Sequence, residues 1–227
     1  MISLRGKFLG TGLLLGLTAL TQTAQAGVIF QTATQDPTAL SIDNTLTLQG
    51  DGTTAGNGVT GGSFMIGADF TLTAATQIAS IGAMFADTAL TMGSGSIFGA
   101  IVAVDPVTGL PTKSVENLAS ITLGKAVFTP TVDGDTTAAL NLLLGPGTYG
   151  LVFGSGLFGA TGIADILSGN DPVGSPPMIV NDFAPFAPDP FDTDVRLFVN
   201  AVPEPSSGVL FLSAGLMLAL MRRRLRR

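Results

Sequence analysis

The stretch Phe64-Met65-Ile66-Gly67-Ala68-Asp69-Phe70-Thr71-Leu72 alternates apolar side chains with a second set that is mostly small or polar. The apolar set is Phe64, Ile66, Ala68, Phe70 and Leu72, and the residues between them are Met65, Gly67, Asp69 and Thr71. Successive side chains of a β-strand point to opposite faces of the sheet. The pattern therefore predicts a half-buried strand over residues 64–72, with the apolar set in the core.

Further strand candidates follow this segment, separated by turn signals. In residues 78–85 the apolar side chains are Ile78, Ile81, Ala83 and Phe85, so they move from an even position to odd positions near Ser80. This predicts a strand whose alternation is interrupted at that point. The other strand candidates are residues 97–104, 118–123, 127–129, 138–144, 148–153 and 195–199. Residues 105–111 and 145–147 combine Gly with Pro and are predicted to be turns.

This spacing predicts an all-β fold, with a single jelly-roll-like β-sandwich as the expected architecture. Strands with an amphipathic helix of about 10–15 residues between them would indicate a parallel α/β fold, and we find no such helix. Residues 163–167 favour one helical turn. The Gly- and Thr-rich segment 49–62 and the segment 169–190, which contains six prolines, are predicted to be long loops.

The first 26 residues have the composition of a cleaved signal peptide. Arg5 and Lys7 precede an apolar run over residues 8–20, and a polar stretch then ends in Ala24-Gln25-Ala26. Signal peptidase accepts small side chains at positions such as Ala24 and Ala26. The apolar run is shorter than the roughly 20 residues that a membrane span needs. We therefore expect cleavage after Ala26 by signal peptidase rather than a permanent anchor.

The domain predicted between the two terminal segments, residues 27–201, is strongly acidic. It contains three basic residues (Lys113, Lys125 and Arg196) and 15 acidic ones, so its net charge is −12. The whole chain has a net charge of only −6 because seven of its ten cations lie in the terminal segments. An acidic domain repels polyanions, which argues against DNA or RNA as a partner.

The chain contains no Cys, no His and no Trp. Without Cys there are no disulfides and no thiolate ligands for a structural zinc. Without His, both the Ser-His-Asp triad and the zinc-protease site are excluded. We therefore expect no cofactor and a domain that is not an enzyme.

Two acidic clusters could supply oxygen ligands to Ca²⁺, which takes six to eight of them. The larger cluster consists of Asp182, Asp189, Asp192 and Asp194, and the smaller one is Asp133-Gly-Asp135. Neither matches the EF-hand loop or the glycine-rich calcium repeat. Solvated loop carboxylates are the alternative interpretation, which the sequence leaves open.

Paired carboxylates can also hydrolyse glycosidic bonds, but such sites usually need aromatic platforms for the sugar. The predicted domain has no Trp and a single Tyr, Tyr149, which lies in a strand candidate. A glycoside hydrolase is therefore the least favoured alternative. A flat threonine array for ice binding is also not favoured, because the pairs Thr71/Thr73 and Thr45/Thr47 are isolated.

The C-terminal 26 residues, 202–227, form a three-part tail. The motif Val202-Pro203-Glu204-Pro205-Ser206 comes first and is followed by an apolar segment over residues 208–221. The end of the chain carries the cations Arg222, Arg223, Arg224, Arg226 and Arg227. The apolar segment is short for a bilayer, but flanking Arg side chains can extend it. By the positive-inside rule the Arg cluster stays in the cytoplasm, which leaves the acidic domain outside the inner membrane.

This order of motif, span and Arg cluster resembles the PEP-CTERM sorting signal of exopolysaccharide-producing Gram-negative bacteria. The resemblance covers residues 202–227 and implies recognition by an exosortase, a membrane transpeptidase that would cleave near residues 203–205. The motif residues are then substrate features, and the inner membrane is a temporary anchor. The same kind of tail is also labelled an ice-binding protein C-terminal domain, a label that describes the tail alone.

Together these features predict an exported protein of the cell surface or extracellular matrix. The expected role is structural, adhesive or exopolysaccharide-associated, as in a biofilm. A carbohydrate-binding module and a calcium-stabilised adhesin module are the alternatives.

Overall fold

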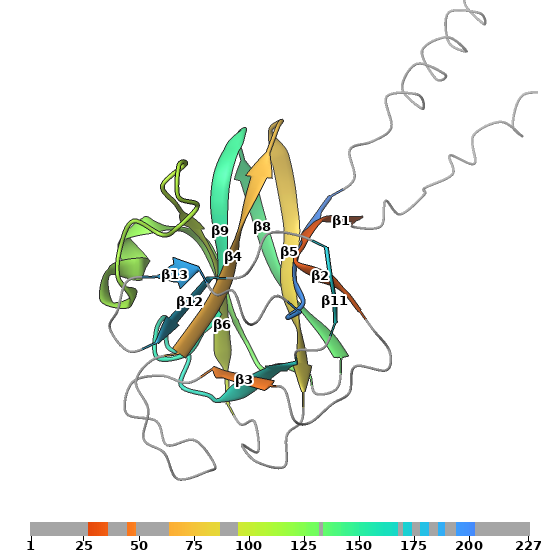
Figure 1. Cartoon of the computed structure of the whole chain (residues 1–227), viewed down its shortest axis with the longest axis vertical. Helices are drawn as coiled ribbons and strands as arrows, with labels where there is room; N and C mark the ends of the chain where they lie inside the picture. The colour runs from red at the N-terminus through yellow and green to blue at the C-terminus, as the bar shows by residue number, and fades with distance from the viewer. Residues whose placement is uncertain are drawn as a thin grey trace, which may run out of the picture.

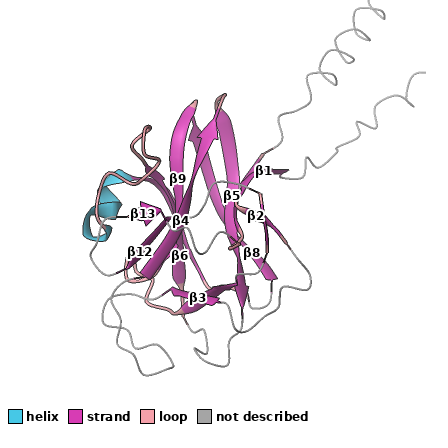
Figure 2. Ribbon diagram, in the orientation of Figure 1, coloured by secondary structure: helices cyan, strands magenta, loops and turns pink. Residues whose placement is uncertain are grey.

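The computed structural model describes residues 27–35, 45–48, 64–86, 95–131, 134–167, 170–173, 178–181, 186–188 and 194–202. Within these ranges the chain consists mostly of β-strands that pair antiparallel, with one short 3₁₀ helix (Figure 2). The prediction of an all-β fold is confirmed. No helix in these ranges is long and apolar enough to cross a membrane, and the predicted span at 208–221 lies outside them.

The described strands form two six-stranded sheets and a two-stranded ribbon (Figure 1). The first sheet has the order β1 (Gly27–Gln31), β14 (Leu197–Ala201), β5 (Thr76–Ala86), β10 (Ala164–Leu167) and β3 (Thr45–Leu48), and β8 (Gly134–Leu144) pairs with the opposite edge of β5. The second sheet has the order β13 (Ala187–Pro188), β12 (Met178–Asn181), β4 (Phe64–Leu72), β9 (Gly147–Gly154), β6 (Ile97–Ala103) and β7 (Thr122–Phe128). The ribbon pairs β11 (Asp171–Pro172) with β2 (Ala33–Thr34).

The main hydrophobic cluster takes side chains from both sheets. From β4 it contains Ile66, Ala68, Phe70 and Leu72, as the alternation predicted. From β5 it contains Ile78, Ile81, Ala83 and Phe85, and from β9 Leu151 and Phe153. Edge-to-face contacts of Phe85 with Phe128 and Phe153 link strands of the two sheets. Burial of these apolar side chains is the main source of stability of the fold.

The other face of β4 is not simply exposed to solvent, and here the half-buried prediction is too coarse. Met65 is fully buried in a second cluster, which we call the outer cluster. Its members are Met65, Phe98, Ala100, Val102, Leu118, Val152, Ala160 and Phe186. The 3₁₀ helix η1 (Val115–Ile121) contributes Leu118, and the segment after β9 contributes Ala160. The second sheet therefore buries apolar side chains on both faces, which explains the continuous apolar run of β6.

Three local predictions are wrong. Residues 118–123 were expected to be a strand, but η1 continues to Ile121 and β7 begins only at Thr122. Residues 163–167 were expected to form a helical turn, but 164–167 are β10, which pairs with both β3 and β5. The segment 169–190 was expected to be a loop, but it contains β11, β12 and β13. In the last two cases the strand conformation depends on pairing with partners far away in the chain. The predicted loop 49–62 lies outside the described residues.

The predicted break in β5 is present. Ile78 pairs with Ala201 of β14 and with Leu142 of β8, whereas Ser80 pairs with Asn200 and Ala139. The register therefore shifts on both edges of β5 between Ile78 and Ser80. Such bulges bend a sheet and re-aim its side chains. Asn141, in the shifted part of β8, has a positive φ of 51°, and its Oδ1 accepts a hydrogen bond from Gln77 Nε2 at 2.9 Å.

The predicted turn after β6 is built around Asp105. Its Oδ1 accepts hydrogen bonds from the backbone N–H groups of Val107 at 2.8 Å and Thr108 at 3.1 Å. These two bonds favour the ionised carboxylate, so the pKa of Asp105 lies below its usual value. Gly109 closes the turn at φ 71°, and its N–H donates to the Asp105 carbonyl at 2.8 Å. The carboxylate of Asp105 is thus part of the turn itself.

Candidate functional site

The first and last strands of the described chain pair with each other. In the antiparallel pair of β1 and β14, Gly27 lies opposite Ala201. Ala201 also lies opposite Ile78 of β5, and the N–H of Val202 donates to the carbonyl of Gln77 at 2.9 Å. The two ends of the predicted domain, 27 and 201, therefore leave the first sheet at the same place.

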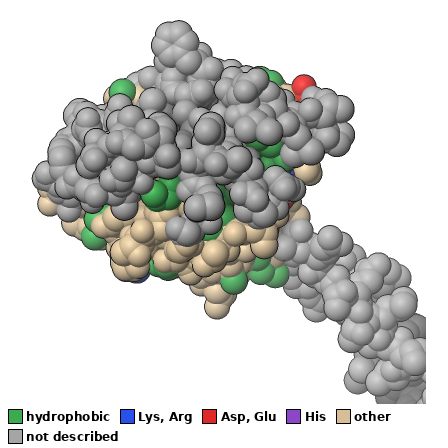
Figure 3. All heavy atoms as spheres, turned by 90° about the horizontal axis from the view of Figure 1, so that it is seen from below, with side chains coloured by type: hydrophobic (Ala, Val, Ile, Leu, Met, Phe, Trp, Pro, Cys, Tyr) green, Lys and Arg blue, Asp and Glu red, His purple; other side chains and the backbone are tan. Residues whose placement is uncertain are grey.

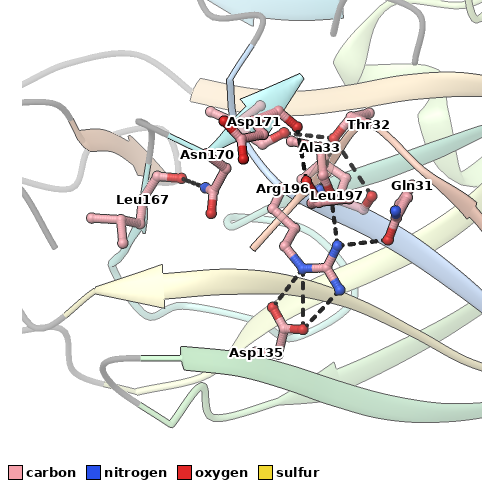
Figure 4. Close-up of polar contacts among 11 residues, drawn as sticks. Gln31, Thr32, Ala33, Asp135, Leu167, Asn170, Asp171, Arg196 and Leu197 are labelled. Carbon is pink, nitrogen blue, oxygen red and sulfur yellow. Dashed lines mark hydrogen bonds and ion pairs between the residues drawn. The ribbon is translucent and has the colours of Figure 1, made fainter. Parts of the chain in front are cut away.

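Arg196, the residue before β14, is buried and makes five hydrogen bonds to side chains and backbone (Figure 4). Nε contacts Oδ1 and Oδ2 of Asp135 at 3.0 and 3.1 Å, and Nη2 contacts Oδ2 at 3.0 Å. Nη1 donates to Oε1 of Gln31 at 2.7 Å and to the carbonyl of Ala33 at 2.6 Å. We call Arg196, Asp135, Gln31 and Ala33 the Arg196 cluster.

The neighbours of the Arg196 cluster fix its position. Oγ1 of Thr32 donates to the carbonyl of Val195 at 2.5 Å and accepts from the N–H of Leu197 at 2.9 Å. The guanidinium also lies over the ring of Phe198, 4.8 Å from its centroid. That ring occupies the space above Gly82, where any Cβ would collide with it. The absence of a side chain at Gly82 is therefore what allows this stack.

The electrostatics of the Arg196 cluster indicate a structural role. The side chain of Arg196 is 9% exposed and that of Asp135 is 28% exposed, so the ion pair lies at the edge of the interior. A buried guanidinium is tolerated only where acceptors surround it. Here those acceptors come from β1, β2 and β8, and they join the N-terminal strands to the segment that leads into β14. The carboxylate of Asp135 is occupied by Arg196 and is not positioned as a free general base.

In the sequence Asp135 belongs to the small acidic cluster 133–135, and its partner is not evident there. In the structure Asp135 binds Arg196, while Asp133 lies outside the described residues. One signal was available, because Arg196 is the single Arg of the predicted domain and lies within the apolar strand candidate 195–199. A cation in such a segment requires a counter-charge, but the sequence does not say which of 15 acids supplies it.

The larger acidic cluster, predicted to bind Ca²⁺, is described only in part. Asp182, Asp189 and Asp192 lie outside the described residues. Asp194 is described, and its backbone carbonyl accepts a hydrogen bond from the N–H of Asn170 at 3.1 Å. Within the part of the chain that the structure describes, no three Asp or Glu residues are grouped to hold a metal ion. The calcium site at these four residues stays a prediction.

Tyr149, the single tyrosine, is used within the fold. Its hydroxyl donates to the carbonyl of Gly145 at 3.0 Å across the turn between β8 and β9. Its ring packs against Phe70, with 5.8 Å between the centroids. A hydroxyl that bonds back to the backbone a few residues upstream is a recurrent contact in Greek-key β domains. Tyr149 therefore links the turn between β8 and β9 to the main cluster.

Most residues of the predicted processing sites lie outside the described ranges. This holds for Ala24 and Ala26, for the motif residues 203–206, and for the Arg cluster at 222–227. Val202, the first motif residue, is described and is 44% exposed. Few charged side chains are visible on the described surface in Figure 3, which shows mainly hydrophobic side chains, backbone and uncharged side chains.

Comparison with models of known protein families, with curated proteins and with solved structures finds no match for this chain.

Proposed function

We propose that this chain is an exported protein of the cell surface or extracellular matrix, sorted by an exosortase through residues 202–227. The pairing of Gly27 with Ala201 carries the proposal. Gly27 directly follows the predicted signal-peptidase site, and Ala201 directly precedes the sorting motif. Both predicted processing events then fall just outside paired strands.

This position matters because a proteolytic cut inside a strand removes core contacts. Cleavage after Ala26 leaves β1 intact, and cleavage within 203–205 leaves β14 intact. Within the described residues the sorting motif contributes one hydrogen bond to the sheet, from Val202 to Gln77. The domain can thus lose both terminal segments and keep every described strand.

The proposed role of the released domain is structural, adhesive or exopolysaccharide-associated rather than enzymatic. The chain has no His or Cys for acid–base or thiolate chemistry. Among the described polar residues, Asp135, Asp105 and Tyr149 are held in contacts within the fold. We also propose that the two sheets form a jelly-roll-like β-sandwich, which is supported by the main cluster that they share.

A processing assay tests the proposal, and the chain offers a matched control because Glu204 and Glu116 are its two glutamates. The full chain carries an epitope tag after Arg227 and is produced in a Gram-negative host with and without its exosortase. With the enzyme we expect the tag to separate from the domain and the domain to reach the surface. Glu204→Gln should slow this separation, and Glu116→Gln should leave it unchanged.

The proposal fails if the tag stays attached in both hosts, since the tail is then an ordinary anchor. Equal slowing by the two Gln variants would also contradict it, because the motif would have no special role. The non-enzymatic role is tested separately by incubating the released domain with the exopolysaccharide of the host. Binding without change in polymer length is expected, and any turnover of the polymer would contradict the structural role.

A further inference from the structure

The outward face of the first sheet carries exposed apolar side chains near Gly27 and Ala201, the two ends of the predicted domain. Val28 of β1 is 49% exposed, Leu143 of β8 is 67% exposed, and Val202 after β14 is 44% exposed. We call these three residues the exit surface. Scattered apolar residues are ordinary on a protein surface, so their relative positions decide whether this set has meaning.

The strand register puts the three side chains on one face. Ile78 is in the main cluster, and its partners Ala201 and Leu142 share its inward face. Their neighbours Val202 and Leu143 therefore point outward, and Leu143 lies opposite Gln77, whose carbonyl accepts from Val202. Val28 lies opposite Asn200, which is next to Ala201 and points outward as well.

The strands around the exit surface carry almost no charge. The strands β1, β5 and β14 contain no charged residue. β8 contains only Asp135, which lies toward the other end of the strand, opposite Met84, and pairs with Arg196. On these four strands an anionic surface therefore meets no carboxylate that lacks a cationic partner.

The tail keeps this end near the bilayer. Only five residues, 203–207, separate Val202 from Gly208, where the predicted span begins, so the two are six residue steps apart. A fully extended chain of that length reaches about 20 Å at most. Three partly exposed aliphatic side chains bind a membrane weakly by themselves, but a short tether makes the contact intramolecular and raises the effective concentration of lipid.

We propose that the exit surface rests on the lipid headgroups of the inner membrane while the tail is inserted. This inference rests on the proposed function, because it needs the tail to be a membrane span. The contact orients the domain with β1 and the end of β14 toward the bilayer. It holds the segment after Val202 close to the membrane surface, where a membrane transpeptidase can reach it. Release of the tail ends the tether, and the acidic domain then leaves the membrane.

The absence of Cys from the chain makes a depth measurement straightforward. Val28→Cys and Leu143→Cys place a polarity-sensitive fluorophore on the exit surface of the full chain. Val127→Cys is the matched control, because Val127 is a valine of β7 that is 43% exposed and pairs with Phe98 of the outer cluster, on the opposite side of the molecule. Leu216→Cys, in the predicted span, reports whether the tail is inserted. The vesicles contain phosphatidylethanolamine and phosphatidylglycerol with nitroxide-labelled lipid.

We expect lipid nitroxides to quench the labels at 28 and 143 several-fold more strongly than the label at 127.

Quenching at 216 without quenching at 28 and 143 would overturn the inference and leave the proposed anchoring intact. A label at 216 that is not quenched would contradict the anchoring itself, and the inference falls with it. Equal quenching at 28, 143 and 127 would mean unspecific adsorption. A blue shift at 28 and 143 without quenching would mean that protein covers this face. Either of these two results also overturns the inference.

Discussion

At the scale of single residues, the charge of Arg196 is balanced by groups from three strands. Gln31 comes from β1, Ala33 from β2 and Asp135 from β8, while Arg196 itself leads into β14. A buried charge that loses its partner costs far more than the pair contributes, because the remaining group is left without water. The contribution of the Arg196 cluster is therefore measured best by removing one partner at a time.

Arg196→Met removes the charge and all five side-chain hydrogen bonds but keeps an apolar side chain of similar length. We expect the free energy of unfolding to fall by about 3 kcal/mol, the low end for a broken buried pair, because Asp135 can regain water. Lys113→Met, at an exposed cation, is the control and should change stability by less than about 0.5 kcal/mol. Urea denaturation measures both. Equal stability of the two variants would show that the Arg196 cluster is not structural.

At the scale of secondary-structure elements, β5 is the strand on which the first sheet is organised. It pairs with β14, β8 and β10, and its bulge between Ile78 and Ser80 shifts the register on both sides. The alternation and the break of β5 were predictable from the sequence, because successive side chains of a strand point to opposite faces whatever its partners are. The identity of its three partners was not, since pairing joins residues far apart in the chain.

Gly82 in the middle of β5 is required by the stack of Phe198 under Arg196. A Cβ at this position would collide with the Phe198 ring and lie 2.5 Å from the carbonyl oxygen of Thr136. We expect Gly82→Ala to destabilise the fold by about 1–3 kcal/mol through overpacking. The control is Gly134→Ala in the adjacent strand β8, where a Cβ meets nothing within 4 Å. That variant should be neutral or stabilised by up to about 1 kcal/mol.

Thermal unfolding followed by circular dichroism separates these two glycine variants. A Gly82→Ala variant with the melting temperature of the unsubstituted chain would mean that Phe198 has a second position. Loss of stability in Gly134→Ala would mean that β8 needs glycine for a reason unrelated to space.

At the scale of the whole molecule, the ends of the predicted domain are adjacent because β1 and β14 pair. Residues that face each other in an antiparallel pair have Cα atoms about 5 Å apart. The two ends can therefore be joined without distortion. The same adjacency places both predicted processing sites at one end of the first sheet.

A circular permutant tests this adjacency. A linker of about four residues joins Ala201 to Gly27, because strand partners lie about 5 Å apart, and new ends open between Val107 and Thr108. Val107 is 91% exposed, so we expect the permuted domain to fold with a melting temperature slightly below that of the unpermuted domain. The control opens the chain between the buried residues Ala100 and Ile101 of β6 and should not fold. Failure of both permutants would contradict the adjacency of the ends.

Residue order is enough to predict the all-β class, the core face of β4, the break in β5 and the turn at Asp105. Each depends on side-chain parity or on the turn preferences of neighbouring residues, and both are local properties. The folded chain instead sets the burial of Met65, the strand at residues 164–167 and the pairing of Asp135 with Arg196. Those outcomes depend on contacts between distant segments, which residue order alone does not fix. The pairing of Gly27 with Ala201 is of this second kind, because it joins the two ends of the predicted domain.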